Sequence, residues 1–325
     1  MKAIIPVAGM GSRLRPHTYT IPKVMLNVAG KPIIGHIFDK LIEDGITEAT
    51  VIIGYKGDVI ENYLRSNYTI PIDFVEQSEL LGLGHSIWVA QRTFSDSEPI
   101  FIILGDTIFD VDLKKVLGGK NSSLGVKWVE DPRRFGVAEV EDGKIKKLIE
   151  KPEKPTSNLA IVGLYYITNP KKLKDALNYL VDNNVRTKNE YQLTDALQKM
   201  IKEGETFTTF NVEGWYDCGK PETLLSTNQV LLSMKGTNAK IPGVVINPPV
   251  FIHPNAKIKN SVIGPNTTIG ENAVIEDSII SNSIIGTEAK VDASLLNESI
   301  VGNGALISGR FRKINVGDMT EIDFS

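Results

Sequence analysis

The sequence of 325 residues contains one cysteine, four histidines and no long apolar run. The single cysteine, Cys218, can form neither an intrachain disulfide nor an all-cysteine zinc site, which favours a reducing compartment. A membrane-spanning helix needs about 18 or more consecutive apolar residues. The apolar stretch from Ala3 to Ala8 is also too short for the core of a signal peptide. We therefore expect a cytosolic protein without a membrane partner.

The net charge of the whole chain is small and indicates no strongly charged partner. A net charge of −3 gives no global field that would attract nucleic acid, so any phosphate-binding site has to be local. Hydrophobic residues make up 42% and charged residues 23% of the chain, which excludes wholesale disorder. The length is enough for about two domains.

The first 230 or so residues alternate between short apolar runs and longer amphipathic runs. Four runs have the pattern of strands: Lys2–Val7, Ala49–Ile53, Ile72–Val75 and Ile100–Leu104. Three runs have apolar residues at helical spacing: Ile33–Glu43, Val59–Arg65 and Gly84–Gln91. This alternation predicts an α/β fold with a mostly parallel sheet, and such sheets bind ligands at the carboxyl ends of their strands.

Beyond Pro242 one aliphatic residue recurs every five or six positions. The repeated positions are Ile252, Ile258, Ile263, Ile269, Ile275, Ile280, Ile285, Val291, Leu296, Val301 and Ile307. The period predicts a triangular parallel β-helix in which these side chains point inward. A β-sandwich is the alternative, but alternation of period two is poor. Because Ser233–Lys240 reads as a linker, we expect domains at 1–235 and 236–325.

A glycine-rich turn directly follows the first predicted strand. It consists of Ala8, Gly9, Met10, Gly11, Ser12 and Arg13. Successive backbone N–H groups in such a turn can cradle an anion, and an arginine can complete the cradle with a two-pronged contact to phosphate. The spacing matches neither the dinucleotide fingerprint nor the Walker loop. Taken alone, the turn could equally be an ordinary connection between a strand and a helix.

A carboxylate, Asp106, ends the predicted strand Ile100–Leu104. The carboxyl end of a strand is where an open parallel sheet places its ligand. An oxygen ligand next to triphosphate oxygens is what Mg²⁺ prefers. The alternative is an aspartate that only caps the next turn.

The strings GMGSRLRPHT, IPKVML and AGKPI together resemble the N-terminal signature of the sugar nucleotidylyltransferases. The resemblance implies that Ala8, Gly9, Gly11, Ser12 and Arg13 hold a nucleoside triphosphate and that Lys23 reaches its phosphates. Ser12 stands where the family usually has threonine and keeps the hydroxyl. The family has a Rossmann-like catalytic domain, and its long forms carry a left-handed β-helix.

Further segments resemble the rest of this family's site. The resemblance implies that Gln77 and Gly82 bind the base, and that Asp217 joins Asp106 in holding Mg²⁺. It also implies a sugar-phosphate half of the site, formed by Gly136, Glu150, Lys151, Val162 and Lys188.

The resemblance implies transfer of a nucleotide from dTTP or UTP to a hexose 1-phosphate, with glucose 1-phosphate favoured and pyrophosphate released. Arg13, Lys23 and Lys151 would neutralise the phosphates. Alternatives are a mannose-1-phosphate guanylyltransferase, a catalytically silent nucleotide-sugar sensor and a scaffold. A fourth, weaker alternative is an acyltransferase that uses His253. We expect a homo-oligomer, because a short β-helix exposes an end and flat faces.

Overall fold

The computed structural model describes residues 1–235 and 240–309, which form two compact units. The first unit consists of Met1–Leu26 and Lys31–Leu224. The described residues of the second are Asn27–Gly30, Leu225–Lys235 and 240–309. The expected linker lies partly outside the described residues, at 236–239, as does the end of the expected second domain, at 310–325. The expected domain boundary at residue 235 stays a prediction.

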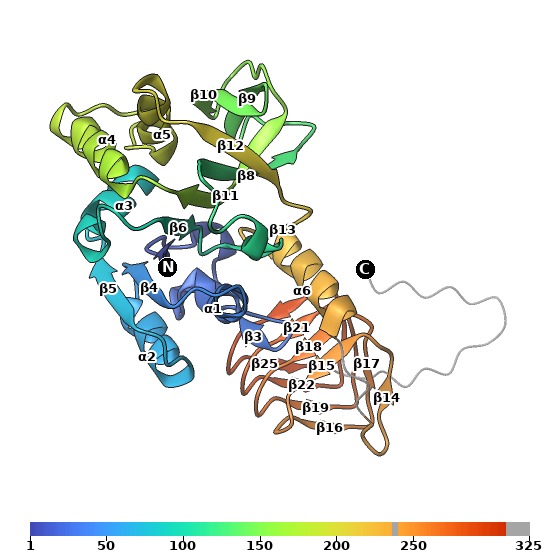
Figure 1. Ribbon diagram of the computed structural model, residues 1–325. Helices are drawn as coiled ribbons and strands as arrows, with labels where there is room; N and C mark the ends of the chain where they lie inside the picture. The colour runs from blue at the N-terminus through green and yellow to red at the C-terminus, as the bar shows by residue number, and fades with distance from the viewer. Residues whose placement is uncertain (236–239, 310–325) are drawn as a thin grey trace. The chain divides into compact units, whose positions relative to one another are not determined.

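A mixed sheet forms the centre of the first unit, in the order β10-β9-β11-β6-β1-β4-β5 (Figure 1). Its parallel part is β1 (Lys2–Pro6), β4 (Glu48–Ile53), β5 (Ile72–Glu76) and β6 (Ile100–Ile103). These are the four strands that the sequence predicts, each within about two residues. Ile4, Val51 and Ile102 are fully buried on them, as expected of strands covered on both faces.

The other part of the sheet is centred on β11 and is antiparallel, except that β12 pairs parallel with β8. β11 pairs antiparallel with β6, β8 and β9, and β9 pairs antiparallel with β10. Parallel pairing needs a long crossover, whereas β9 and β10 are joined by Asp142 and Gly143, both at positive φ, in a tight hairpin. The strands are β8 (Ser122–Trp128), β9 (Gly136–Glu141), β10 (Lys144–Glu150), β11 (Leu159–Ile167) and β12 (Phe207–Asn211).

The first unit also contains helices, some of which pack on its sheet. They are α1 (Ile33–Glu43), α2 (Gly57–Asn67), α3 (Leu83–Val89), α4 (Pro170–Asp182) and α5 (Leu193–Lys202), and α6 (Pro221–Lys235) continues into the second unit. The apolar faces of α3, α4 and α5 share one core cluster with the sheet. Within the described residues, no helix has the length and apolarity needed to cross a membrane.

Short elements connect this framework. They are β3 (Lys31–Pro32), β7 (Thr107–Asp110), β13 (Gly214–Asp217) and the 3₁₀ turns η1 (Ser12–Leu14), η2 (His17–Tyr19), η3 (Lys23–Met25), η4 (Gln91–Thr93) and η5 (Leu113–Lys115). β7 and β13 form a separate two-stranded antiparallel ribbon. This ribbon connects segments that lie about a hundred residues apart in the chain.

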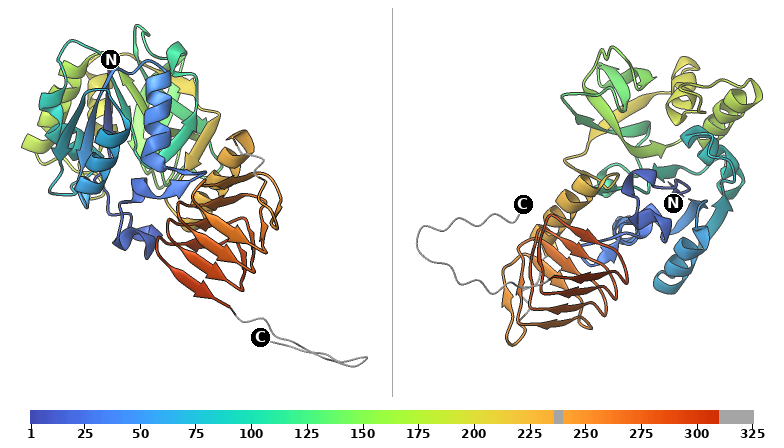
Figure 2. Two further views of the ribbon diagram at one scale, coloured as in Figure 1. Left: turned by 90° about the horizontal axis from the view of Figure 1, so that it is seen from below. Right: turned by 180° about the vertical axis from the view of Figure 1, so that it is seen from behind.

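The second unit is the expected left-handed β-helix, with three faces of four parallel strands (Figure 2). One face is β14 (Val245–Ile246), β17 (Val262–Ile263), β20 (Ile279–Ser281) and β23 (Leu295–Asn297). The next is β15 (Val250–Ile252), β18 (Thr267–Ile269), β21 (Ile284–Ile285) and β24 (Ile300–Val301). The third is β16 (Lys257–Lys259), β19 (Val274–Glu276), β22 (Lys290–Asp292) and β25 (Leu306–Ser308). β2 (Asn27–Val28) also belongs to this unit.

Seven of the aliphatic positions that the repeat singled out are buried in the core of the β-helix, and the other four, Ile252, Ile258, Leu296 and Ile307, are partly buried and pack against it. Strands pair at separations of 17 residues, as Val245 does with Val262, or 16, as Ile279 does with Leu295. Corners between strands often have positive φ, as at Asn260, which asparagine tolerates better than most residues. The period of five to six residues thus reports one strand and one corner.

Candidate active site

The glycine-rich turn leaves the carboxyl end of β1 and enters η1. Gly11 has a φ of 62°, and a Cβ atom there would lie 2.9 Å from the Cβ of Lys23 and 3.1 Å from Thr18 Cγ2. Its carbonyl accepts a hydrogen bond of 2.9 Å from Thr18 Oγ1. Glycine is therefore required at position 11 both by the backbone conformation and by the close approach of Lys23.

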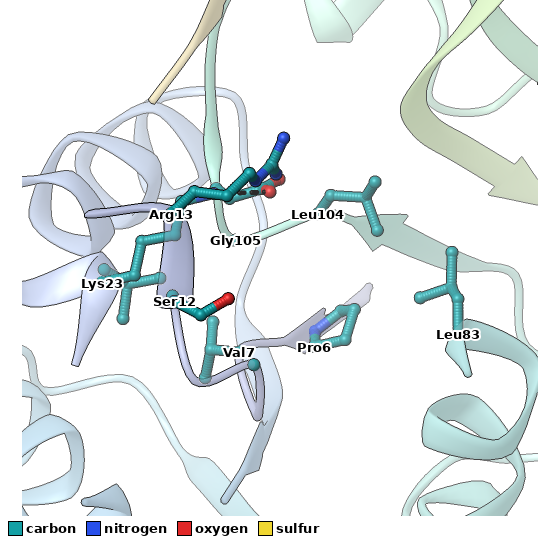
Figure 3. A pocket seen from close by; sticks show the side chains of 12 residues that line it. Pro6, Val7, Ser12, Arg13, Lys23, Leu83, Leu104 and Gly105 are labelled. Carbon is teal, nitrogen blue, oxygen red and sulfur yellow. Dashed lines mark hydrogen bonds and ion pairs between the residues drawn. The ribbon is translucent and has the colours of Figure 1, made fainter. Parts of the chain in front are cut away.

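Two further close approaches bring strand ends to this turn. A Cβ on Gly105, after β6, would lie 2.2 Å from Val7 Cγ1, and a Cβ on Gly54, after β4, would lie 2.8 Å from the Ala8 carbonyl oxygen. A pocket of about 360 Å³ opens beside them. In Figure 3, Ser12 and Arg13 lie on one side of this pocket, with Leu104 and Leu83 opposite. The carboxyl ends of β1 and β6 thus frame the pocket, as expected of a parallel sheet.

Lys23 and Asp106 meet in the pocket, although 83 positions separate them. Lys23 is 8% exposed, and its Nζ lies 2.8 Å from Asp106 Oδ2. Burial acts to raise the pKa of Asp106, but the Lys23 ammonium and its hydrogen bond outweigh it and hold this pKa below its ordinary value. Asp106 is thus an anion at neutral pH.

Asp217 reaches the same region through the ribbon of β7 and β13. Its register partner in the ribbon is Thr107. The Cys218 backbone N–H donates a hydrogen bond of 3.1 Å to the Asp106 carbonyl. A Cβ on Gly219 would lie 2.8 Å from Asp217 Oδ1 and 3.1 Å from Arg13 Nη2, so the guanidinium lies at this end of the site. Asp106, directly before β7, and Asp217, the last residue of β13, therefore lie at the same end of the ribbon.

These carboxylates fit a divalent cation that also binds phosphate. Among residues 1–235 and 240–309 there is no group of three or more His, Cys, Asp or Glu side chains that could hold a metal by itself. Mg²⁺ typically takes one or two carboxylates and completes its coordination with phosphate oxygens and water. Asp106 and Asp217 match this donor set.

Three of the five predicted sugar-phosphate residues lie where β9, β10 and α5 meet. Glu150 pairs with Gly136 across the strands, and its Oε2 accepts a hydrogen bond of 2.7 Å from Thr194 Oγ1. Lys151 Nζ lies 3.4 Å from Glu150 Oε1. The Lys151 N–H donates 3.0 Å to the Phe135 carbonyl. Gly136, Glu150 and Lys151 therefore share one small region.

A β-bulge in β11 connects the region of the predicted sugar-phosphate residues to the strand end that precedes Asp106. The register of β11 against β8 shifts between Ile161 and Tyr165, where Val162 is buried and Gly163 has a φ of 84°. The Gly163 carbonyl accepts a hydrogen bond of 3.0 Å from the backbone N–H of Leu104, which lies two residues before Asp106. Bulges of this kind are frequent beside active sites because they redirect the strand.

The predicted base-binding residues contact each other, but they do not line the 360 Å³ pocket. Gln77 is 5% exposed, and its Nε2 donates 3.3 Å to the Gly82 carbonyl and contacts His85 Nδ1 at 3.1 Å. Burial lowers the pKa of His85, which favours the neutral ring that this contact needs. The Gln77 amide donor is thus already engaged inside the protein.

The role of Lys188 in binding the sugar phosphate stays a prediction. The structure places Lys188 Nζ 3.9 Å from Glu153 Oε1 and records no contact of it with Glu150 within the described residues. Conversely, sequence reasoning gave no role to Thr194 or to the ring contact between Phe135 and Trp215, whose centroids lie 5.0 Å apart. Their partners lie 44 and 80 positions away, and local patterns carry no signal for such contacts.

The fold is that of an α/β protein with a pocket at the carboxyl ends of parallel strands. Cationic side chains and Asp106 line this pocket, and the ribbon of β7 and β13 brings Asp217 to the same region, which is an arrangement for polyphosphate and a divalent cation. Comparison with known proteins shows the family. Residues 2–234 match the family described as nucleotidyl transferase, and residues 246–317 match the GMPPB C-terminal domain. The chain belongs to the nucleotidyl transferase family and is a sugar nucleotidyltransferase.

Among curated relatives, the chain is 38% identical to the low-salt glycan biosynthesis nucleotidyltransferase Agl11 of Haloferax volcanii, covering 72% of this chain and 67% of that protein. It is 34% identical to UTP–glucose-1-phosphate uridylyltransferase AglF of the same organism, covering 68% and 93%. The crystal structure of a UDP-glucose pyrophosphorylase complexed with UDP-glucose superposes with a TM-score of 0.62 at 27% identity, covering 72% and 98%.

Proposed function

We propose that this chain transfers a nucleotide from UTP or dTTP to glucose 1-phosphate and releases pyrophosphate. The observation that carries the proposal is the convergence of Lys23, Asp106 and Asp217 beside the glycine-rich turn, with Glu150 and Lys151 across the β11 bulge. The similarity to AglF and to a UDP-glucose pyrophosphorylase supports these substrates.

The triphosphate would bind along the glycine-rich turn. A Cβ on Gly9 would meet no protein atom within 4 Å, so the chain itself does not need glycine there, and the open backbone suits close approach of phosphate. Arg13 and Lys23 would then neutralise the phosphate oxygens. Lys23 would exchange its 2.8 Å ion pair with Asp106 for a phosphate, which frees the carboxylate.

The bound divalent cation, for which we propose Mg²⁺, would be held by Asp106 and Asp217 and would polarise the phosphate under attack. A sugar 1-phosphate is already largely ionised near neutral pH, because its second pKa is about 6. No general base is therefore needed. Lys151 and Glu150 would orient this nucleophile, so catalysis is mainly positioning and neutralisation of charge in a direct displacement.

Gln77 is the residue that we assign to the base. Its Nε2 is bound by the Gly82 carbonyl, so its Oε1 is the atom that would accept from the N3–H of uracil or thymine. Guanine offers a similar N–H donor. Transfer of a guanylyl group to mannose 1-phosphate therefore stays the alternative.

One panel of reactions tests the proposal. Pyrophosphate release is measured for five nucleoside triphosphates against glucose 1-phosphate, mannose 1-phosphate and other sugar 1-phosphates. We expect the highest kcat/KM with UTP or dTTP and glucose 1-phosphate. Highest activity with GTP and mannose 1-phosphate would establish the alternative, and no release with any pair would favour a silent sensor or a scaffold.

We also propose that the β-helix assembles copies of this chain. Val245, Val262, Ile279 and Leu295 lie in register on one face, and three of them are exposed by 58%, 49% and 76% in the order Val245, Ile279, Leu295. A second copy would cover this aliphatic row. A role of His253 in acyl transfer has no further support, since its Nδ1 accepts the Asn255 N–H at 3.2 Å.

A further inference from the structure

The side-chain amide of Gln77 can pair with a pyrimidine base in two ways. Its Oε1 accepts a hydrogen bond and its Nε2 donates one. Uracil and thymine carry an N–H donor at N3, whereas cytosine carries an acceptor nitrogen there. An amide that presents Oε1 therefore selects uracil or thymine, and an amide that presents Nε2 selects cytosine. The groups that hold one end of the Gln77 amide decide which end is left for the base.

Two groups of the first unit hold the Nε2 end of Gln77. Nε2 donates 3.3 Å to the Gly82 carbonyl and lies 3.1 Å from His85 Nδ1. The bond to Gly82 is slightly longer than the usual range of about 2.7–3.2 Å, so the contact with His85 is the closer one. Within the part of the chain that the structure describes, Gln77 Oε1 accepts no hydrogen bond. Because Nδ1 accepts only while it carries no proton, the orientation of the amide depends on the His85 ring.

Aromatic contacts fix the His85 ring, which lies on α3 and is 9% exposed. The ring stacks on Trp88, with 5.5 Å between the centroids, and on Tyr191, with 6.2 Å. The Gly84 backbone N–H donates a hydrogen bond of 2.8 Å to the Tyr191 carbonyl, which anchors the start of α3. This packing holds the plane of the imidazole beside the Gln77 amide.

The surroundings of His85 favour its neutral form. Burial lowers the pKa of the ring, and the Arg186 guanidinium, from the segment between α4 and α5, acts in the same direction. The carboxylate and the backbone of Glu79, from the segment before α3, act to raise this pKa and are outweighed. Arg186 is itself fixed, because its Nη2 donates 3.1 Å to Tyr191 Oη and its guanidinium lies 4.5 Å from the centre of that ring. His85 Nδ1 is therefore free of a proton at neutral pH.

We propose that His85 is a positioning residue for base recognition: its Nδ1 holds the Nε2 end of Gln77, so that Oε1 faces the base and cytosine is rejected. This role of His85 rests on the proposed function of Gln77. Cytosine N3 would meet Oε1 with two acceptors face to face, and both would lose a hydrogen bond. A side chain that could pair with either base thereby discriminates between them.

The test compares the dissociation constants of UTP and CTP, each with Mg²⁺, measured by calorimetry on the full chain. The parent should bind UTP more tightly than CTP by about tenfold or more. His85→Leu removes the acceptor, so either end of the amide can face the base. The preference for UTP should then fall about tenfold, the scale of one well-placed hydrogen bond. In a Gln77→Ala background His85→Leu should have no further effect, because the residue through which it acts is gone.

Two matched variants separate positioning from general damage. His85→Asn keeps an acceptor in place of Nδ1, so the preference for UTP should stay close to the parental value. Gln91→Leu removes an amide from η4, just beyond α3, whose Nε2 donates 3.3 Å to Asn178 Oδ1. This loss does not involve Gln77, and the preference should again be parental.

A pH series gives a readout that a merely structural role of His85 would not change. The charged imidazole has a donor at both nitrogens and no acceptor, so protonation of His85 should turn Oε1 toward the ring. The parental preference for UTP should be constant above the ordinary histidine pKa of 6.5 and should fall as the pH is lowered further. That of His85→Asn should not change. The phosphates of UTP and CTP titrate alike, and their titration cancels in the ratio.

The outcomes distinguish the role of His85 from that of Gln77. If Gln77→Ala keeps the parental preference, Gln77 does not read the base, and both roles fail. If Gln77→Ala lowers the preference but His85→Leu does not, only the role of His85 is overturned. It is also overturned if the parent binds UTP and CTP equally, if His85→Leu acts equally in both backgrounds, or if His85→Asn or Gln91→Leu has the effect of His85→Leu.

Two further results are read separately. If His85→Leu does not fold, the pH series decides, and a parental preference that does not change with pH overturns the role of His85. Absence of pyrophosphate release in the substrate panel would contradict the proposed reaction, on which the binding of UTP and CTP does not depend.

Discussion

Replacing Gly11 with alanine should disturb the site in two ways, through backbone strain and through steric overlap with Lys23. The position has a φ of 62°, and the new Cβ would lie 2.9 Å from Lys23 Cβ, where ordinary carbon contacts begin at about 3.5 Å. The turn or the lysine must therefore move by roughly half an ångström or more. Because Lys23 Nζ lies 2.8 Å from Asp106 Oδ2, this movement changes the geometry at the carboxylate.

The two constraints have different sizes and different consequences. Left-handed backbone costs alanine about 1–2 kcal/mol, which should lower the stability of the fold. A misplacement of about 1 Å can cost a factor of about 10² in rate, so a shift of half that size should lower kcat/KM by roughly 10-fold to 10²-fold. Loss of activity should therefore exceed what the loss of stability explains.

Steady-state kinetics of pyrophosphate release, with thermal melts of the same samples, tests this expectation. Gly118→Ala is the matched control, because Gly118 has a φ of 92° and no atom within 4 Å of a Cβ. It should lower the melting temperature but not kcat/KM. If folded Gly11→Ala retained the parental kcat/KM, the argument that Gly11 positions Lys23 would be refuted.

Four further predictions concern other parts of the molecule. Asp217→Asn should lower kcat by about 10²-fold or more under subsaturating Mg²⁺, and parental turnover there would exclude a two-carboxylate site. Gln77→Ala should weaken use of the preferred triphosphate by about 1–3 kcal/mol in kcat/KM, without changing the Mg²⁺ dependence. Burial lowers the pKa of His85 from its ordinary value of 6.5, so the unfolded chain takes up this proton first as pH falls. The contribution of the neutral His85 ring to the stability of the fold is therefore complete above pH 6.5 and is lost as the pH falls below 6.5. The melting temperature of the parent should thus fall more between about pH 7.5 and 5.5 than that of His85→Asn, which keeps an acceptor for Gln77 but does not titrate. Leu295→Lys should reduce the assembly mass in light scattering, and an unchanged mass would reject the aliphatic row as the interface.

Local patterns in the sequence predicted the elements that depend on which way side chains point. The aliphatic residue of each repeat had to be buried, because a strand and a corner of five or six residues return the chain to the same interior. The four parallel strands and α1 were found in the same way. The glycine-rich turn was recognisable because positive φ at Gly11 restricts the residue type.

Tertiary structure decided which of these elements meet. The antiparallel pairing of β11, the approach of Asp217 to Asp106 and the bond from Thr194 to Glu150 join residues far apart in the chain. The membership of Asn27–Gly30 in the second unit is of the same kind, since nothing in those four residues identifies Asn228 as their partner. The spacing of apolar residues along the chain predicts which side of its own helix or strand a residue faces. Its distant partners are selected only when the whole core packs and every buried polar group finds a hydrogen bond.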